Sequence, residues 1–226
     1  MRCGRHILAP VLAVLLGLTV FSGGCGQKSE APTSKNDAVP LKNTDFVNLQ
    51  EYIPALEIDL VYATENNFTG QKLYDSPAAY LRKGTADKLK RAAEEVNTRG
   101  YRLKIWDAYR PPQAQVKMWN TAPDPRYLAD PRKGSDHSRG CAVDLTLIDP
   151  KGNELDMPSG FDDFSPRADR DYSDVSPEQR NNAMYLEKVM VKQGFFSIWR
   201  EWWHFADSDR KAYDVAEKAP LPNTEN

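Results

Sequence analysis

The chain has 226 residues, of which 40% are hydrophobic and 27% are charged, an ordinary composition for a globular protein. Its 30 basic and 32 acidic residues nearly balance, and no clustered basic excess predicts a nucleic-acid surface. The three cysteines are Cys3, Cys25 and Cys141. Because Cys3 falls in the expected leader, a disulfide framework is excluded, and the fold has to rely on its core, a bound metal, or both.

The N-terminus has the features of an export signal. Two arginines precede an apolar run at residues 7–21, which is short for a membrane span and typical of a secretory signal. Ser22-Gly23-Gly24-Cys25 then resembles a bacterial lipoprotein cleavage site. We therefore expect residues 1–25 to be a signal peptide, with lipid on Cys25 anchoring an exported protein to the bacterial envelope membrane. Simple secretion to the periplasm and an uncleaved anchor are the alternatives.

The next segment, residues 26–44, is polar and poor in large apolar side chains, which predicts a disordered tether. From residue 45 the composition becomes globular, and residues 45–226 are expected to form a single domain. No internal repeat is present.

The first half of this domain alternates strand and helix patterns. Apolar and polar residues alternate around residues 52–62, which predicts a strand. A helical spacing follows from residue 85 to residue 98, with Thr85 as the expected N-cap and Gly100 closing the C-terminus. Residues 101–106 alternate again and predict the next strand.

The second half combines helices, strands and long loops. The expected elements, in order, are a helix from Pro111-Pro112 to about Asn120, a loop at 121–136, a strand at 141–148, a loop at 149–175, a helix capped by Ser176 and ending near Gln193, and paired strands within 195–206. This order predicts an α+β fold, in which an antiparallel sheet flanked by helices carries the site, and it does not match the βαβ alternation of a parallel sheet.

Outside the leader the chain has two histidines, His137 and His204, and Asp144 follows the first of them by seven residues. Two histidines and an aspartate are the minimum three-ligand set of a catalytic zinc site, which leaves a fourth position for water. A lone His-x6-Asp is also explained by a structural histidine, and a buried arginine could compensate the charge of Asp144 in its apolar strand. The second histidine, with its neighbouring glutamate, favours the metal.

Glu201 precedes His204 by three residues and is placed to act as a general base. A surface ion pair with Arg200 or Arg210 is the alternative. On a regular strand, residues three apart face opposite sides. If Glu201 and His204 face the same metal, the chain must be bulged or sharply twisted there, or must form a single helical turn.

Two motifs carry a resemblance to a known family: Ser-x-His-x2-Gly-x-Ala-x-Asp over residues 135–144 and Glu-x2-His over residues 201–204. They resemble the zinc signature of the D-alanyl-D-alanine peptidases, most closely the VanX-type D-Ala-D-Ala dipeptidases. Further similar segments occur in the family's order at residues 59–64, 67–70, 106–111 and 161–162, so the resemblance runs from about residue 46 to residue 207. It implies the zinc peptidase fold shared with hedgehog-like proteins, and a strand at Glu201.

The resemblance implies roles for further residues. Arg110 would stabilise the oxyanion that forms during peptide hydrolysis, and Asp107 could hold its guanidinium in place. A solvated surface arginine is the alternative for Arg110. The expected substrate-binding residues are Ser135, Asp162 and Asp107, with Asp162 recognising a free ammonium group. A further pocket tyrosine would be Tyr74 or Tyr80.

Four other residues attract simpler interpretations. Cys141 lies in the strand beside the ligands and is expected to be a small buried thiol, not a nucleophile. The tryptophans at positions 199, 202 and 203 are expected in the core and the pocket wall.

The implied function is an exported enzyme with one Zn²⁺ per chain that hydrolyses D-Ala-D-Ala and related D,D-dipeptides derived from the cell wall. A D,D-carboxypeptidase or endopeptidase acting on peptidoglycan stem peptides is the closest alternative, and a non-catalytic wall-binding lipoprotein is a third. Beyond the dipeptide substrate and the membrane, no protein or nucleic-acid partner is implied.

Overall fold

The computed structural model describes residues 40–218, and a five-stranded sheet supplies the framework for the site. The strands lie side by side in the order β2-β4-β5-β7-β6. Their bounds are Glu57–Ile58 for β2, Arg102–Asp107 for β4, Ala142–Ile148 for β5, Phe195–Ile198 for β6 and Glu201–Asp207 for β7. Every residue of the central strand β5 is buried, which explains its almost continuous apolar sequence.

The pairing within this sheet is mainly antiparallel. β4 with β5, β5 with β7 and β6 with β7 are antiparallel pairs, whereas the short β2 is parallel to β4. A second, two-stranded sheet pairs β1 (Phe46–Asn48) with β3 (Tyr80–Arg82). The predicted α+β fold with an antiparallel sheet is confirmed, and the parallel edge strand is an addition to it.

The strand predicted over residues 52–62 is mostly wrong. The helix α1 (Leu49–Tyr52) ends where that strand should begin, and β2 is the part of the segment that pairs with β4. The chain then forms a 3₁₀ turn at Val61–Ala63. Leu60 and Tyr62 are buried as their alternation suggested, but a turn has buried them instead of a strand. Periodicity of burial over so few residues does not distinguish the two.

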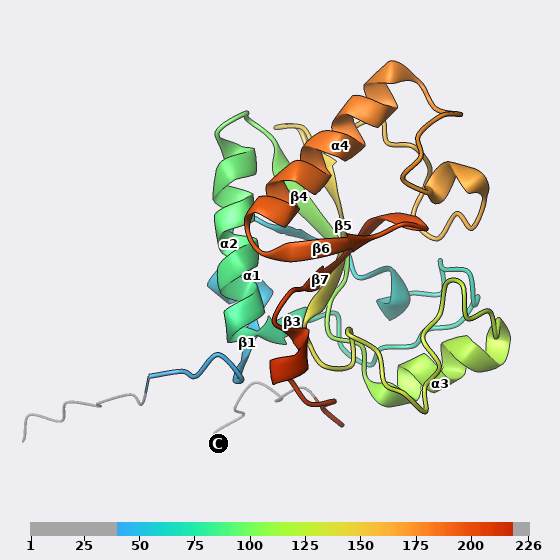
Figure 1. The fold of residues 1–226 in the computed structure, drawn as a ribbon. Coiled ribbons are helices and arrows are strands. Elements are labelled where there is room, and N and C mark those ends of the chain that lie inside the picture. The colour runs from blue at the N-terminus through green and yellow to red at the C-terminus, as the bar shows by residue number, and fades with distance from the viewer. Residues whose placement is uncertain (1–39, 219–226) are drawn as a thin grey trace, which may run out of the picture. The chain divides into compact units, whose positions relative to one another are not determined.

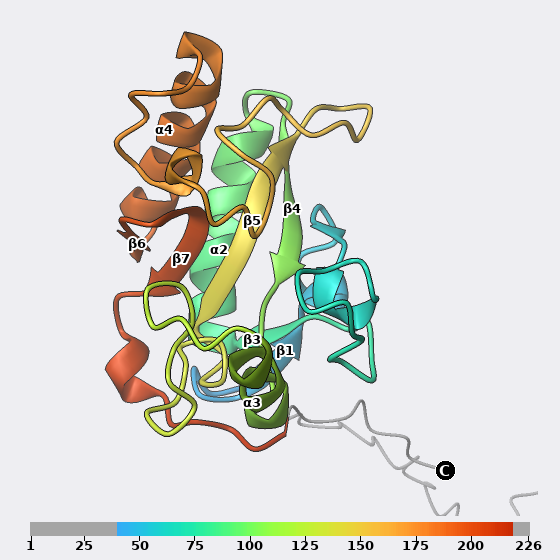
Figure 2. The same ribbon diagram turned by 90° about the vertical axis from the view of Figure 1, so that its right-hand side faces the viewer.

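Three longer helices lie on one face and at one end of the sheet. Figures 1 and 2 show α2 (Lys83–Asn97) and α4 (Pro177–Lys192) side by side on one face, while α3 (Pro112–Thr121) lies beyond the ends of β4 and β5. α2 begins two residues earlier than predicted, and Thr85 is not its N-cap. Instead the buried Thr85 hydroxyl donates to Oδ2 of Asp207 at 2.7 Å, so a tertiary contact has replaced the expected local one.

The helix α4 follows its sequence signals closely. The Ser176 hydroxyl accepts from the backbone N–H of Gln179, and the Gln179 side chain accepts in return from the Ser176 N–H, which forms a capping box. The predicted buried face is confirmed, with Ala183, Leu186, Val189 and Met190 all in the core. Gly194, at φ 96°, ends the helix and starts β6.

The domain begins slightly before the predicted boundary. The carbonyl oxygens of Asn43, Thr44 and Asp45 accept hydrogen bonds from residues 82–84, so the last residues of the segment predicted as a tether are attached to the domain. Residues 40–218 belong to one compact unit, and among them no helix is both long and apolar enough to cross a membrane. The predicted signal peptide, the lipid on Cys25 and the rest of the tether lie outside the described residues.

Candidate active site

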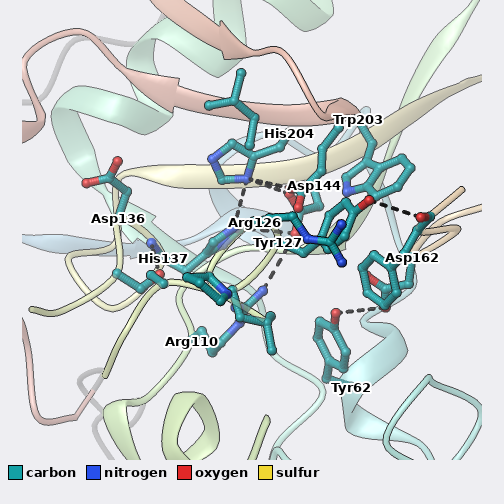
Figure 3. A pocket seen from close by; sticks show the side chains of 17 residues that line it. Tyr62, Arg110, Arg126, Tyr127, Asp136, His137, Asp144, Asp162, Trp203 and His204 are labelled. Carbon is teal, nitrogen blue, oxygen red and sulfur yellow. Dashed lines mark hydrogen bonds and ion pairs between the residues drawn. The ribbon is translucent and has the colours of Figure 1, made fainter. Parts of the chain in front are cut away.

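Three side chains predicted as metal ligands meet at the end of the sheet near α3 (Figure 3). Asp144 in β5 and His204 in β7 are direct cross-strand neighbours, and His204 Nδ1 lies 2.9 Å from Asp144 Oδ1. His137, from the loop before β5, places its Nε2 3.2 Å from His204 Nδ1 and 3.4 Å from Asp144 Oδ2. The structure therefore brings together residues that lie far apart in the sequence.

This donor set fits a metal ion. Donors around a tetrahedral zinc with bonds of about 2.0–2.2 Å are about 3.3–3.6 Å apart, close to the separations found here. His137 Nδ1 donates to the carbonyl oxygen of Ala108 at 2.8 Å, which fixes the ring and leaves Nε2 free to act as a ligand. Within residues 40–218, His137, Asp144 and His204 form the single such group.

The electrostatics of two of the three residues, Asp144 and His204, suit a cation. Burial alone would raise the pKa of Asp144, but the neighbouring His137 and His204 rings lower this pKa below its ordinary value. Burial also lowers the pKa of His204, which keeps its ring neutral. For His137, burial lowers the pKa, but Asp144 and Asp107 together outweigh this effect, so its pKa is raised. A carboxylate that stays ionised and a neutral imidazole are the ligand forms that a metal requires.

The loop before β5 turns sharply into the strand at Gly140. Its φ is 73°, and a Cβ at this position would collide with the ring of Phe46. A residue without a side chain at this position therefore allows both the bend and the close approach of Phe46. Ser135, at the other end of this loop, accepts a hydrogen bond from the His137 N–H at 3.1 Å. It lines a cavity into which the three predicted ligands also open.

A bulge in β7 solves the geometric problem of Glu201 and His204. The pairing of β6 with β7 passes directly from Ser197 opposite Phe205 to Ile198 opposite Glu201, so residues 202–204 have no partner on β6. Because this interrupts the alternation of side chains, Glu201 Oε2 lies 4.0 Å from His204 Nδ1. The predicted strand with a bulge is confirmed.

Glu201 is buried, with 7% of its surface exposed. Burial, followed by the like charges of Asp144 and Asp162, raises its pKa well above the ordinary value, against the opposing effect of Arg110. In the described part of the chain Glu201 forms no ion pair with Arg200 or Arg210, so the surface-pair alternative is wrong. A carboxyl group with a raised pKa beside the ligand group is suited to transfer protons.

Arg110 is a buried member of the site. Its Nε and Nη2 donate to Oδ2 of Asp107 at 2.9 and 2.6 Å, and its Nη1 donates to the Gln115 side chain of α3 at 2.8 Å. Nη2 also lies 3.7 Å from Asp144 Oδ2. The solvated alternative for Arg110 is therefore wrong, and the arginine partner considered for Asp144 is present together with the two histidines.

The substrate-binding assignment of Asp107 needs correction. This residue has no exposed surface and does not line the cavity. Its carboxylate accepts from Arg110, from the Tyr74 hydroxyl at 2.5 Å and from the Ala108 N–H at 2.8 Å. Asp107 thus acts on the site by holding Arg110, as its three-residue spacing suggested, and it has no surface left to contact a substrate.

Asp162 lies on the opposite side of the same cavity. Its backbone has a φ of 57°, and its Oδ2 accepts from the Tyr62 hydroxyl at 2.8 Å (Figure 3). Burial raises the pKa of Asp162 to about 7, although the hydrogen bond from Tyr62 opposes the shift. The predicted pocket tyrosines, Tyr74 and Tyr80, do not line this cavity, and Tyr62 and Tyr127 do.

The comparison with known proteins now identifies the group to which this site belongs. A family model described as D-ala-D-ala dipeptidase, of peptidase family M15, matches residues 42–220. The chain belongs to the M15 peptidase family. The M15 peptidases are metallopeptidases, in agreement with the His-Asp-His group.

Curated relatives of this M15 peptidase match over most of their length. A D-alanyl-D-alanine dipeptidase of Escherichia coli K12 is 42% identical over 172 residues, which cover 76% of this chain and 89% of that protein. The dipeptidase of the same name from Enterococcus faecium is 31% identical, covering 79% and 95%. That of Streptomyces coelicolor is 34% identical, covering 78% and 98%.

Several residues that line the cavity of this M15 peptidase were not predicted from the sequence. Arg126 and Tyr127 come from the loop at 121–136, line the cavity and carry no periodic signal. The Tyr127 hydroxyl donates to the Phe164 carbonyl at 3.0 Å, which joins this loop to the loop of Asp162. Tyr62 falls in the strand predicted over residues 52–62, and the alternation there does not distinguish a cavity residue from a core residue.

Of the remaining predictions for this M15 peptidase, those for Cys141, Trp202 and Trp203 are confirmed and that for Trp199 is wrong. Cys141 is fully buried, and burial raises its pKa, so the thiol is inert as expected. Trp202 is in the core and Trp203 lines the cavity, in agreement with the prediction. Trp199 is 60% exposed, so its assignment to the core or pocket wall is wrong; it occupies the tip of the β6–β7 hairpin.

Proposed function

We propose that this chain is a zinc D,D-dipeptidase that hydrolyses D-Ala-D-Ala to two molecules of free alanine. The observation that carries the proposal is the convergence of His137, Asp144, His204, Glu201 and Arg110 on one cavity of about 240 Å³. The names of the curated relatives support the same substrate.

Zinc is the proposed metal because two imidazoles and one carboxylate, with the remaining position open, are the ligand set of catalytic zinc sites. When bound, it would polarise the substrate carbonyl and lower the pKa of a water molecule. The residues that would hold it are His137 through Nε2, His204 through Nδ1 and Asp144 through its carboxylate.

Glu201 is the proposed general base and acid. It accepts a proton from the water that attacks the peptide carbonyl carbon, and it delivers that proton to the amine nitrogen as the C–N bond breaks. Burial supports this role, because it raises the pKa of Glu201 well above the ordinary value of a glutamate and so favours acceptance of a proton. A non-catalytic wall-binding protein would not need a glutamate beside all three ligands, so the presence of Glu201 there weighs against that alternative.

Arg110 is the proposed donor to the oxyanion that develops on the carbonyl oxygen. Its guanidinium is held on two sides, by Asp107 and by Gln115, so little reorganisation is needed as charge develops. Burial lowers the pKa of Arg110, but Asp107, together with Tyr74, Tyr62 and Asp144, raises it well above its ordinary value, so the side chain remains charged.

The opposite wall is proposed to bind the substrate's free ammonium group through Asp162, with Tyr62 orienting the carboxylate. Ser135 is proposed to contact another polar group of the dipeptide. Drug-sized ligands occupy pockets of about 300–1,000 Å³, so a cavity of about 240 Å³ favours a dipeptide over a stem pentapeptide. This size weighs against the carboxypeptidase and endopeptidase alternatives.

We also propose that the protein acts outside the cytoplasm, on dipeptides released from the cell wall. The support comes from the sequence of residues 1–25, with its apolar run and Ser-Gly-Gly-Cys site, which favours an exported lipoprotein. An enzyme in that location would scavenge or turn over wall-derived peptides.

The experiment incubates the purified protein and Zn²⁺ with D-Ala-D-Ala, with L-Ala-L-Ala and with a stem pentapeptide ending in D-Ala-D-Ala. We expect hydrolysis of D-Ala-D-Ala alone. Faster release of D-Ala from the pentapeptide would identify a carboxypeptidase instead. Binding of any of these peptides without turnover would support the non-catalytic alternative.

A further inference from the structure

A buried arginine outside the proposed catalytic set holds the bulge of β7. Arg170 lies in the long loop between β5 and α4, the same loop that carries Asp162. This loop passes beside the tip of the β6–β7 hairpin in Figure 1. The Arg170 side chain is 5% exposed, and its own backbone N–H donates to the carbonyl of Trp199 at 2.9 Å.

The guanidinium of Arg170 binds the hairpin through backbone carbonyls. Nε donates to the Ile198 oxygen at 2.8 Å, on the last residue of β6. Nη2 lies within hydrogen-bonding distance of three oxygens of β7, those of Trp202 at 2.9 Å, Glu201 at 3.2 Å and His204 at 3.3 Å. One side chain therefore contacts the backbone on both sides of the bulge.

These contacts replace the hydrogen bonds that a neighbouring strand would otherwise make. Residues 202–204 have no residue opposite them on β6, so their buried carbonyls on that side need another donor. A guanidinium has five N–H donors in a rigid fork, more than any other side chain, and can serve several carbonyls at once. An ammonium group has a single nitrogen with three donors, so it cannot serve all of these carbonyls and the other partners of the guanidinium at once.

On the side away from the bulge, an acidic, a hydroxyl and an aromatic side chain compensate the buried positive charge of Arg170. Nη1 lies 3.4 Å from Glu187 Oε2 of α4 and donates to the Tyr172 hydroxyl at 3.3 Å. The guanidinium carbon also lies 4.9 Å from the centre of the Phe205 ring. A buried cation is tolerated only with such partners. Because every nitrogen of the guanidinium has a partner, its position is fixed.

We propose that Arg170 is a positioning residue that fixes Glu201 and His204 relative to each other by stabilising the bulge between them. Without the bulge, regular pairing of β7 would turn residues 201 and 204 toward opposite faces of the sheet. Because Arg170 belongs to the Asp162 loop, it also fixes the proposed ammonium-binding wall relative to the proposed base. The inference rests on the proposed function for its kinetic readout, but its metal readout is independent.

The test compares Arg170→Lys and Arg170→Met with the control Arg167→Met in the full chain. Arg167 is an exposed arginine of the same loop, and it also donates to backbone carbonyls, those of Pro158 and Asp174, without touching β7. Each variant is measured for kcat and KM with D-Ala-D-Ala, for Zn²⁺ affinity by chelator competition, and for the visible spectrum after Co²⁺ loading.

Arg170→Met is expected to lose about 10²-fold in kcat, the effect of misplacing a catalytic group by about 1 Å, and Arg170→Lys is expected to lose less, with KM changed only a few-fold in both. Zn²⁺ affinity should fall about 10- to 100-fold, as when a residue that orients a metal ligand is removed. The Co²⁺ spectrum should change with it. Arg170→Lys should retain part of the function, and Arg167→Met should match the wild type in all three measurements.

Wild-type kcat and Zn²⁺ affinity in both Arg170 variants would overturn the inference. An equal loss in Arg167→Met would also overturn it, because the effect would then belong to the loop in general. If Arg170→Met does not fold, Arg170→Lys carries the test, since it keeps the charge and the aliphatic stem. If the wild type does not hydrolyse D-Ala-D-Ala, the proposed function fails, while Zn²⁺ affinity and the Co²⁺ spectrum still decide the role of Arg170.

Discussion

The Tyr62 hydroxyl donates a hydrogen bond of 2.8 Å to Oδ2 of Asp162, across a sequence separation of 100 residues. This bond orients a carboxylate whose pKa burial raises to about 7, in the lining of the cavity that also contains Arg110. A carboxyl group that titrates near neutral pH can make both stability and substrate binding depend on pH.

The titration of Asp162 predicts a pH dependence of stability in the metal-free protein. Its folded pKa of about 7 lies above the unfolded value of about 3.9, so the stabilising effect of protonation is complete below about pH 4 and is lost as the pH rises through 7. Each unit of pKa shift is worth about 1.4 kcal/mol. Urea unfolding at pH 5 and pH 8 should therefore show Asp162→Asn losing less stability than the wild type over this interval. Asp163→Asn is the control and should keep the wild-type slope; an unchanged slope in Asp162→Asn would contradict the prediction.

Glu201→Gln should separate proton transfer from metal binding. The substitution keeps the shape of the side chain but removes the proton acceptor, and Glu201 is not one of the three ligands. Turnover of D-Ala-D-Ala should fall by about 10²–10⁴-fold, the usual contribution of a positioned acid–base group. Zinc content, measured on the same preparation, should stay near one per chain. A variant that keeps both zinc and normal turnover would refute the proposed mechanism.

Arg110→Ala and Asp107→Asn should impair the same step by different routes. Loss of an oxyanion donor typically costs about 10²–10³-fold in kcat, and Arg110→Lys should recover only part of it because an ammonium lacks the guanidinium fork. Asp107→Asn leaves Arg110 buried beside a neutral partner, which typically destabilises a protein by about 3–5 kcal/mol. Steady-state kinetics and urea unfolding of each variant measure the two effects. Normal kcat in Arg110→Ala would exclude this arginine from catalysis.

His204→Ala should empty the proposed zinc site, because two ligands remain of the three. A metal that binds only the folded protein stabilises it by about 4 kcal/mol when free metal is at 1,000 times the dissociation constant. A chelator should therefore lower the Tm of the wild type and leave the Tm of His204→Ala nearly unchanged. Full zinc content in the variant would show that the ligand assignment is wrong.

Cys25→Ser tests the proposed attachment to the membrane. If Cys25 carries lipid, the wild type should be found in the membrane fraction, and the variant should appear as a soluble exported protein. Cys141→Ser is a matched control, since Cys141 is a buried thiol within the domain. A wild-type protein that is already soluble after export would contradict lipidation.

Much of the site was predictable from the sequence because its signals are local or rare. The capping box at Ser176 and the buried face of α4 depend on residues within a few positions of one another. The two histidines of the domain could be assigned by counting, since few residue types bind zinc. If Glu201 and His204 face one metal, their three-residue spacing requires a bulge, a sharp twist or a helical turn, and β7 contains a bulge.

The tertiary structure decided which distant residues complete the site. Tyr62 and Arg170 act on residues about 100 and 30 positions away, through contacts that no periodic pattern encodes. Asp107 holds Arg110 as its spacing suggested, but it is not the predicted substrate contact, because its direction depends on Tyr74 and on the end of β4. Local sequence specifies backbone preferences and residue chemistry, whereas the direction of a buried polar side chain is set by whichever donors the folded chain brings within about 3 Å of it.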